Sequence, residues 1–392
     1  MNYFGIDILA PKGLHARLLL AFAGISLIPL LIVSATFFYV LIRNVEGENF
    51  AKLEFVNEAK RSEIRQYIQF ASRQADSLSQ TNIVRYSIGE FYGFSYGFRE
   101  ISTEPEEAAR ILRGAFGIGA GENAISRDDL ISSALIYDNM HTQFHGEYEA
   151  FLASSEYDNL YLVNNGGRIV YSVEKDNYLA TSITGAVSNS PLAKVAHEVL
   201  NGETDQGIVF GDFEHDPVTG EFVAYVAVKV RFYSRPSGAV IFRLQTDGIE
   251  RIVQSETREA GQIYLLSSRR QVLSQPLDGI YAIGERPAID RATLPNSGTA
   301  KIDRGLSSSA ALAAFGDVPV FDANWLLVSE VPSAQAYSTA NTLIGTVTTI
   351  ALLAIPILFL IAARLARSAT NPILRITNTA EAIAAGDLNR SM

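Results

Sequence analysis

Cysteine is absent from the 392-residue chain, which excludes disulfides, thiolate metal sites and cysteine nucleophiles. Motifs for catalysis are missing as well, because the chain contains no nucleophile elbow and no phosphoacceptor histidine motif. The glycine pair in "NNGGRIVYSVEK" lacks the Gly-Lys-Ser/Thr ending of a phosphate loop. We therefore expect no enzymatic activity, no cofactor and no metal within residues 1–392, and a fold stabilised by its apolar core alone.

Charged residues are absent from two long apolar runs, Leu18–Ile42 with 25 residues and Leu343–Ala363 with 21. Twenty-five helical residues extend roughly 37 Å, which exceeds a hydrocarbon core of about 30 Å. Each run contains one proline, which membrane helices tolerate. We predict transmembrane helices at 18–42 and 337–363. A cleaved signal peptide is the alternative for the first, but its apolar run is too long for one.

Basic residues gather on the outer flanks of these two runs: Lys12, Arg17, Arg364, Arg367 and Arg375. The positive-inside rule then places residues 1–17 and 364–392 in the cytoplasm and residues 43–336 outside the membrane. The segment 43–336 carries 39 acidic and 26 basic side chains. This acidic excess argues against nucleic-acid binding.

Glycine and proline are absent from Glu48 to Ile88, and apolar residues recur there at intervals of three and four. This pattern predicts one amphipathic helix over 44–88 that continues from the first membrane helix. A helix of that length needs a partner helix or a domain lying along it, because it cannot bury its apolar stripe alone.

Short strand-like runs follow, bounded by turn residues such as "NNGG" and "RPSG". The predicted strands are 130–138, 160–164, 168–173, 207–213, 222–230 and 238–244. Two helices are predicted among them, at 139–155 and at 190–202, the latter with Ser190 as its cap. A shorter strand–turn–strand pattern at 261–276 and a strong strand at 324–332 predict a second, smaller sheet module. The order predicts an α+β fold with antiparallel strands and helices on one side.

The stretches "YDNMHTQFHGEYEAFL" and "YDNLYLVNNGGRIVYSVEKDNYLATSI" resemble the double Cache (dCache) family of bacterial extracytoplasmic sensors. In that family two stacked PAS-like modules are mounted on a long N-terminal helix. The positions that carry the resemblance are Tyr137, His141, His145, Val170–Asp176, Phe210–Phe213 and Gln245. The resemblance covers roughly 44–336 and implies a distal module at about 100–250, a proximal module at about 255–335 and a small-molecule ligand. It also implies a location in the bacterial inner (plasma) membrane.

The amino-acid-binding branch of this family carries an Arg-x-Trp-Tyr cluster where this chain reads "SNSPLAKVA". The resemblance therefore implies a small ligand without specifying an α-amino acid. The aspartate that holds the ligand amine in that branch falls near Asp212 in this chain.

The tail "NPILRITNTAEAIAAGDLNRSM" resembles the beginning of a HAMP linker. Ile373, Ile376, Ala380 and Ile383 are spaced three, four and three residues apart, as the seam of a helical bundle requires. This resemblance implies a homodimer and a chain that ends before its output domain. The output is expected to be a methyl-accepting chemotaxis module or a histidine kinase, and cytoplasmic signalling partners would act through it. A nucleotide or diguanylate cyclase is the alternative, so activity of a longer protein stays open.

Candidate ligand-binding residues cluster around the predicted helix at 139–155 and the strand that follows it. His141 and His145 are four residues apart and share a helix face, which could hold a metal, although no third ligand is evident. The alternative is a polar pocket wall. Tyr171, Lys175 and Asp176 lie at a strand end and in the loop after it, where they could hydrogen-bond a small anion or polar solute.

Two further candidates come from later strands. Asp212 is expected near a strand end, where its carboxylate would favour a cationic group or cap a turn. Tyr225 lies in the middle of a strand and is either a ligand contact or part of the core.

These observations predict a transmembrane receptor that senses a small extracytoplasmic ligand. Ligand binding changes the sheet modules, and the second membrane helix transmits the change, which requires the ligand to prefer one arrangement. The alternative from another class is a membrane-anchored module that binds a periplasmic protein partner.

Overall fold

The computed structural model describes residues 14–118, 132, 134–202, 207–233, 235–255, 261–274, 279–287 and 295–384. It divides the chain into two compact units. We call Met1–Asn49 with Ser333–Met392 the helical unit, and Phe50–Pro332 the sheet unit.

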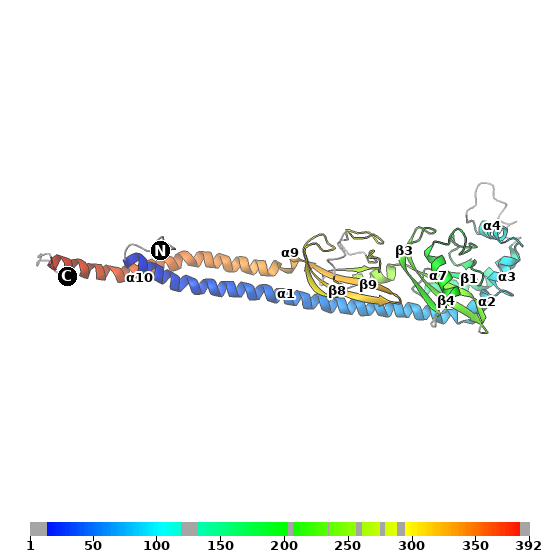
Figure 1. The fold of residues 1–392 in the computed structure, drawn as a ribbon, viewed down its shortest axis with the longest axis horizontal. Coiled ribbons are helices and arrows are strands. Elements are labelled where there is room, and N and C mark those ends of the chain that lie inside the picture. Colours follow the sequence, from blue (N-terminus) through cyan, green and yellow to red (C-terminus); the bar gives the residue numbers. More distant parts are fainter. Residues whose placement is uncertain are drawn as a thin grey trace, which may run out of the picture. The chain divides into compact units, whose positions relative to one another are not determined.

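The described helices are labelled in Figure 1 where there is room. Their bounds are α1 Leu14–Ser79, α2 Asn82–Ser87, α3 Phe94–Arg99, α4 Pro105–Ala115, α6 Leu135–Ala153, α7 Pro191–Asn201, α8 Asp247–Gln254, α9 Ser333–Ala336 and α10 Ser338–Ala384. The strands are β1 Asn159–Asn164, β2 Ile169–Ser172, β3 Ile208–His215, β4 Phe222–Phe232, β5 Arg235–Leu244, β6 Gln262–Leu266, β7 Gly298–Ile302, β8 Ala311–Val320 and β9 Ala323–Pro332. Helix α1 belongs to both units.

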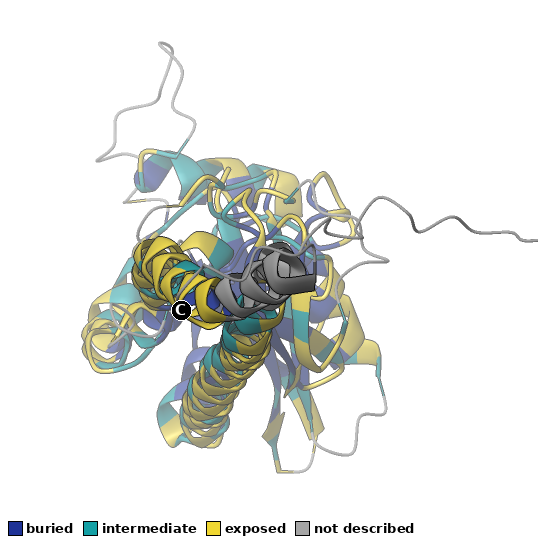
Figure 2. Cartoon of the chain, turned by 90° about the vertical axis from the view of Figure 1, so that its left-hand side faces the viewer, coloured by how far each residue is buried: buried dark blue, intermediate teal, exposed yellow. Residues whose placement is uncertain are grey.

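The helical unit contains two helices that are long and apolar enough to cross a membrane. The most apolar windows of Leu20–Ser79 and Ser338–Pro372 reach mean hydropathies of 2.4 and 2.5, and 0% of either window is buried. Figure 2 colours these helices largely as exposed or intermediate. Both predicted membrane segments therefore lie in continuous helix. Next to the apolar runs, the Tyr337 hydroxyl donates a hydrogen bond of 2.7 Å to Glu46 Oε1.

The first sheet of the sheet unit has five antiparallel strands in the order β2-β1-β5-β4-β3. Side chains alternate between its two faces, as the period of a strand requires. One face carries Leu160, Leu162 and Phe242 and packs in one apolar cluster with residues of α1, α2 and α6. We call it the α6 face. The opposite face carries Tyr161, Tyr225 and their neighbours and packs against α7, so we call it the α7 face.

The second sheet has four antiparallel strands in the order β6-β9-β8-β7. It packs on α1, and hydrogen bonds from one buried side chain of that helix join the two. The Asn57 side chain, which is buried in α1, donates from Nδ2 to the Ala314 and Leu327 carbonyls at 3.2 and 3.1 Å. Gly316 permits this approach, because a Cβ there would lie 2.4 Å from Asn57 Oδ1.

Replacement of Asn57 by alanine is expected to destabilise the sheet unit by about 1–3 kcal/mol, because two buried strand carbonyls lose a donor. Thermal unfolding of the full chain in nanodiscs measures the change. The matched control is Gln69→Ala, which removes an exposed amide from the same helix. Equal unfolding temperatures for the two variants would show that the Asn57 contact contributes nothing.

The structure confirms a mixed fold of antiparallel sheets and helices with a long N-terminal helix. Predicted strands and observed strands agree for β1 to β6 and for β9, and Ser190 caps α7 by accepting from the Ala193 N–H at 3.2 Å. The 261–276 pattern forms β6, and the described part of its second arm, up to residue 274, forms the isolated bridge Leu266–Val272 and no named strand.

Two predictions about elements were wrong. The strand at 130–138 is not formed over its last four residues, which begin α6, and most of its first part lies outside the described residues. The helix predicted over 44–88 ends at Ser79, because Thr81 caps the separate helix α2 with its hydroxyl, 3.5 Å from the Val84 N–H. Strands β7 and β8 were not predicted, since their sequences "GTAKI" and "ALAAFGDVPV" are rich in glycine, alanine, aspartate, lysine and proline, which are depleted in strands.

The HAMP prediction stays a prediction. The backbone of α10 is helical through Ala384, but the side chains of the four seam residues lie outside the described part of the structure.

Candidate functional site

The seven candidate residues lie in three different places on the sheet unit. His141, His145, Tyr171 and Lys175 meet on the α6 face. Asp176 and Tyr225 belong to a polar network on the α7 face. Asp212 contacts the second sheet. The tertiary structure therefore separates Lys175 from Asp176, although the two are adjacent in sequence.

The His–Lys cluster consists of His141, His145, Tyr171 and Lys175. The two imidazole rings come from successive turns of α6 and stack with centroids 4.2 Å apart. His145 Nδ1 lies 2.8 Å from the Tyr171 hydroxyl, and His145 Nε2 lies 2.9 Å from Lys175 Nζ. Phe116 closes one side of the cluster, with its ring centroid 5.2 Å from that of His141.

Positive charge and burial make this cluster electrostatically unusual. Burial, followed by the charge of Lys175 and the neighbouring His145, lowers the pKa of His141 from 6.5 to about 3. Burial and Lys175 also lower the pKa of His145, and burial lowers the pKa of Lys175 itself. Both imidazoles are therefore neutral near pH 7.

The loop after β2 presents the ammonium group to this cluster in a strained backbone conformation. Lys175 has a φ of 49°, in the left-handed region that side chains other than glycine rarely occupy. Such strain persists where contacts hold the residue in place, and it concentrates at functional sites. The Lys175 side chain therefore lies on the α6 face, whereas the Asp176 side chain lies on the α7 face.

The network on the α7 face joins three tyrosine hydroxyls and two carboxylates. Tyr161 donates to Asp176 Oδ2 at 2.5 Å. Tyr178 and Tyr225 donate to Asp216 Oδ2 at 2.7 and 2.6 Å. The three tyrosines are fully buried, and Asp216 is only 1% exposed. We call these five residues the Tyr–Asp network.

Arg243 supplies positive charge at one end of this network. Its guanidinium binds Asp158 at 2.6 Å through Nη2, contacts Glu221 at 2.8 Å through Nη1 and lies 3.8 Å from Asp176. Gln245, the residue singled out by the family resemblance, donates to the same Asp158 carboxylate at 2.6 Å. Burial raises the pKa of Asp176, and the hydrogen bond from Tyr161 opposes that rise.

Asp216 differs from Asp176 because no cation contacts it among the described residues. Its carboxylate is held by Tyr178, Tyr225 and the Val218 N–H, the last at 2.8 Å. A buried carboxylate that is held by neutral donors alone is costly and concentrates negative potential on this face.

Asp212 lies within β3 and not at the end of a strand, contrary to the prediction. Its Oδ1 accepts from the indole N–H of Trp325 at 2.8 Å, and its Oδ2 accepts from the Ser268 N–H at 3.2 Å. Trp325 is in β9 and Ser268 follows β6, so this carboxylate links the two sheets. The position directs Asp212 away from the Tyr–Asp network.

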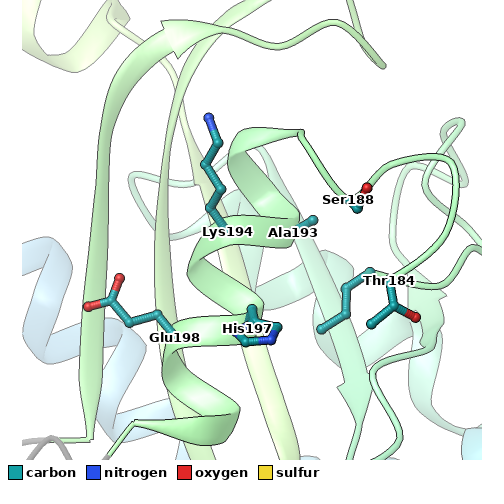
Figure 3. Close-up of a pocket in the computed structure, with 7 residues that line it drawn as sticks. Thr184, Ser188, Ala193, Lys194, His197 and Glu198 are labelled. Carbon is teal, nitrogen blue, oxygen red and sulfur yellow. The ribbon is translucent and has the colours of Figure 1, made fainter.

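A cavity of about 490 Å³ opens beside α7. It is lined by Ile183, Thr184, Ser188, Ala193, Lys194, His197 and Glu198. Figure 3 shows His197 extending from α7 toward Thr184, whereas the Glu198 side chain extends to the other side of the helix. Ile183 and Ala193 belong to the same apolar cluster as Tyr161 and Tyr225, so the cavity borders the α7 face. Its size suits a small ligand.

Sequence reasoning missed Tyr161, Tyr178, Asp216 and Arg243. Asp216 opens the stretch "DPVTGE", whose residue types are typical of a turn and do not distinguish this carboxylate from others. A sharper signal was available in the alternation of "NLYLVN" and "EFVAYVAV", since Tyr161 and Tyr225 occupy strand positions of the same face. Among the described residues, no group of three or more histidine, aspartate or glutamate side chains is placed to hold a metal ion.

No protein-family profile and no curated protein matches this chain in sequence. The solved structures to which this chain is similar include ligand-binding domains of bacterial chemoreceptors. The ligand-binding domain of Pseudomonas fluorescens chemoreceptor CtaA, in complex with L-isoleucine, is 12% identical with a TM-score of 0.43, over 77% of this chain and 98% of that one. The periplasmic sensory domain of Campylobacter jejuni chemoreceptor Tlp1 is 10% identical with a TM-score of 0.42, over 75% and 98% of the two chains. The ligand-binding domain of Pseudomonas aeruginosa amino-acid chemoreceptor PctC, in complex with GABA, is 12% identical with a TM-score of 0.41, over 72% and 99%.

Proposed function

We propose that this chain is a transmembrane signal-transduction receptor whose sheet unit binds a small polar ligand outside the membrane. One observation carries the proposal. A buried network of three tyrosine hydroxyls and two carboxylates covers one face of the first sheet, in a unit joined at both ends to long apolar helices. Buried polar groups in such density cost stability, and a binding function accounts for their presence.

The ligand is proposed to enter through the cavity beside α7 and to reach the Tyr–Asp network. The network offers hydroxyl groups that can donate or accept and carboxylates that accept only. Asp216 has no cationic neighbour among the described residues, so the ligand is expected to bring a hydrogen-bond donor or a positive charge to it.

The change on the α7 face is proposed to reach α10 through the second sheet. Asp212 connects β3 to Trp325 in β9, and β9 leads directly through α9 into α10. The ligand must bind one arrangement of this connection better than the other, because equal affinities shift no equilibrium. The HAMP linker, the homodimer and a chemotaxis or histidine-kinase output complete the proposal and rest on the sequence resemblance.

A thermal-unfolding screen of the full chain in nanodiscs tests the ligand proposal. Organic acids, amines and amino acids are added singly at pH 7.5. A true ligand at a hundred times its Kd stabilises the folded state by about 2.7 kcal/mol. The proposal further expects Asp216→Asn to remove that stabilisation.

The matched control is Asp317→Asn, which changes a carboxylate in the second sheet. A ligand that stabilises both variants equally would place its site elsewhere. If every small molecule fails and a periplasmic protein binds instead, the alternative of a protein-binding module replaces the sensor.

A further inference from the structure

His145 lies between two groups of opposite charge on the α6 face. Its Nε2 atom is 2.9 Å from Lys175 Nζ and 3.1 Å from Glu149 Oε1. A deprotonated Nε2 accepts from the ammonium group of Lys175, and a protonated Nε2 donates to a carboxylate. The ring can therefore exchange a cationic partner for an anionic one by gaining a proton.

His141 provides a second nitrogen with unused hydrogen-bonding capacity. Its Nε2 atom is buried and has no hydrogen-bond partner within the described part of the chain. A buried polar atom left without a partner is costly, so its presence calls for an explanation. The stacked rings bring this nitrogen to the same cluster as His145 and Lys175.

Among the described residues, the negative partners of the cluster have exposed side chains. Glu149 follows His145 by one turn of α6, and its side chain is 61% exposed. Glu174 precedes Lys175 and is exposed. From β2, Tyr171 faces His145 as a neutral hydroxyl, because burial raises its pKa. From α4, Arg113 is engaged by the carbonyl of Asn177 at 2.8 Å.

We propose that His141, His145 and Lys175 form a second site, which binds a small oxyanion, a carboxylate or a phosphate, together with a proton. The ammonium group of Lys175 supplies the permanent charge. The imidazoles add N–H donors once they are protonated, and the exposed carboxylate of Glu149 moves aside for the incoming anion. Charge-assisted hydrogen bonds of this kind are the strong ones in proteins.

Proton uptake follows from the direction of the pKa shifts. Burial and Lys175 depress the pKa values of both imidazoles in the free protein. A bound anion adds a negative charge beside the rings, which offsets the repulsion from Lys175 and raises these pKa values. The complex then binds more protons than the free protein, so affinity for the anion rises as the pH falls below 7.

The same shifts set the pH dependence of stability. A pKa that is lower in the folded chain means stability is lost as the pH falls from 6.5 through 3. A bound oxyanion offsets that loss. This site lies on the opposite face of the sheet from the Tyr–Asp network, and it does not depend on the proposed receptor ligand.

Isothermal titration of the full chain in nanodiscs tests the site, with inorganic phosphate and acetate as separate probes at pH 7.5, 6.5 and 5.5. We expect saturable binding that tightens on acidification, by up to about tenfold per pH unit for each proton taken up. Buffers with different protonation enthalpies give the number of protons. The two probes distinguish a phosphate site from a carboxylate site.

Three variants locate the site. Lys175→Gln is expected to weaken binding at every pH by at least about tenfold, and Lys175→Arg to retain it. His145→Gln is expected to abolish most of the pH dependence. The matched control is His215→Gln, which changes an exposed imidazole in β3 and should alter neither affinity nor proton uptake. Unfolding temperatures measured without anion show that each variant is folded.

The absence of saturable binding by wild-type protein at pH 5.5 would overturn the proposal. So would binding that Lys175→Gln leaves intact, or binding without proton uptake. Loss of anion binding in His197→Gln, which changes the lining of the cavity beside α7, with binding intact in Lys175→Gln, would assign the anion to that cavity and also overturn the proposal.

Discussion

Replacement of Arg243 by methionine is expected to destabilise the sheet unit by about 3–5 kcal/mol. The Arg243 side chain is 9% exposed, and its guanidinium lies within 3.8 Å of the carboxylates of Asp158, Asp176 and Glu221. Removal of one partner from a buried ion pair leaves the opposite charge buried without compensation. Methionine keeps most of the side-chain volume, so the loss reports on charge and not on a cavity. Chemical unfolding followed by tryptophan fluorescence measures it, because Trp325 is the only tryptophan in the sequence.

The control for this change is Arg251→Met, which removes a guanidinium that is 74% exposed and lies 3.3 Å from Glu156. Exposed ion pairs contribute about 0–1 kcal/mol. A loss below about 1 kcal/mol for Arg243→Met would mean that the three carboxylates are solvated well enough to remain without their cation. The proximity of Arg243 to Asp176 would then contribute nothing measurable to stability.

The second prediction concerns the orientation of the chain in the membrane, and it expects each introduced cysteine either to be labelled or to be fully protected. The chain has no cysteine, so single cysteines can be introduced without removing any. A cysteine at the exposed position Thr142 in α6 is expected to react with a membrane-impermeant maleimide in intact spheroplasts. A cysteine at Ser391 is expected to react only after the membrane is permeabilised. Gel mobility of the labelled protein measures both reactions.

The physical reason is the distribution of charge around two apolar helices. Basic residues flank their outer ends, and the segment between them is acidic. Labelling of Ser391→Cys in intact spheroplasts, or protection of Thr142→Cys, would reverse the orientation and remove the basis for an external sensor. Labelling of both positions before permeabilisation would mean that the second apolar helix does not cross the membrane.

Local patterns predicted much of the fold. The "NNGG" turn and its flanking apolar runs specify a hairpin, which forms between β1 and β2. Ser190 and Pro191 mark the start of α7, because the Ser190 side chain accepts from a free N–H and Pro191 needs no donor at the first turn. Gly202 follows the last residue of α7 as predicted, but with a φ of −76° that any residue can adopt. The element at 130–138 was misread since apolar residues in a short run suit a strand and a buried helix turn alike.

The candidate site was predicted only in part. The i, i+4 spacing of His141 and His145 is a property of one helix, and the stacked rings follow from it. Lys175 reaches these rings from a loop 30 residues away in sequence, because its left-handed backbone turns the side chain to the α6 face. Asp176 lies beside Tyr161, and Tyr225 lies beside Asp216, because of the way the strands pair in the sheet. The pattern of neighbouring residues in the sequence does not predict that pairing.

The amino-acid sequence by itself determined the two apolar helices, the hairpin, the caps of α7 and the mixed α and β composition. These features depend on the chemistry of neighbouring residues, which is written in the order of the chain. The tertiary structure alone decided which polar groups share a face: Arg243 beside Asp176, Asp212 against Trp325, and Lys175 against His145. These contacts depend on the order of the strands in the sheet and on the direction in which each side chain points. Both are determined by packing between segments that are far apart in the sequence.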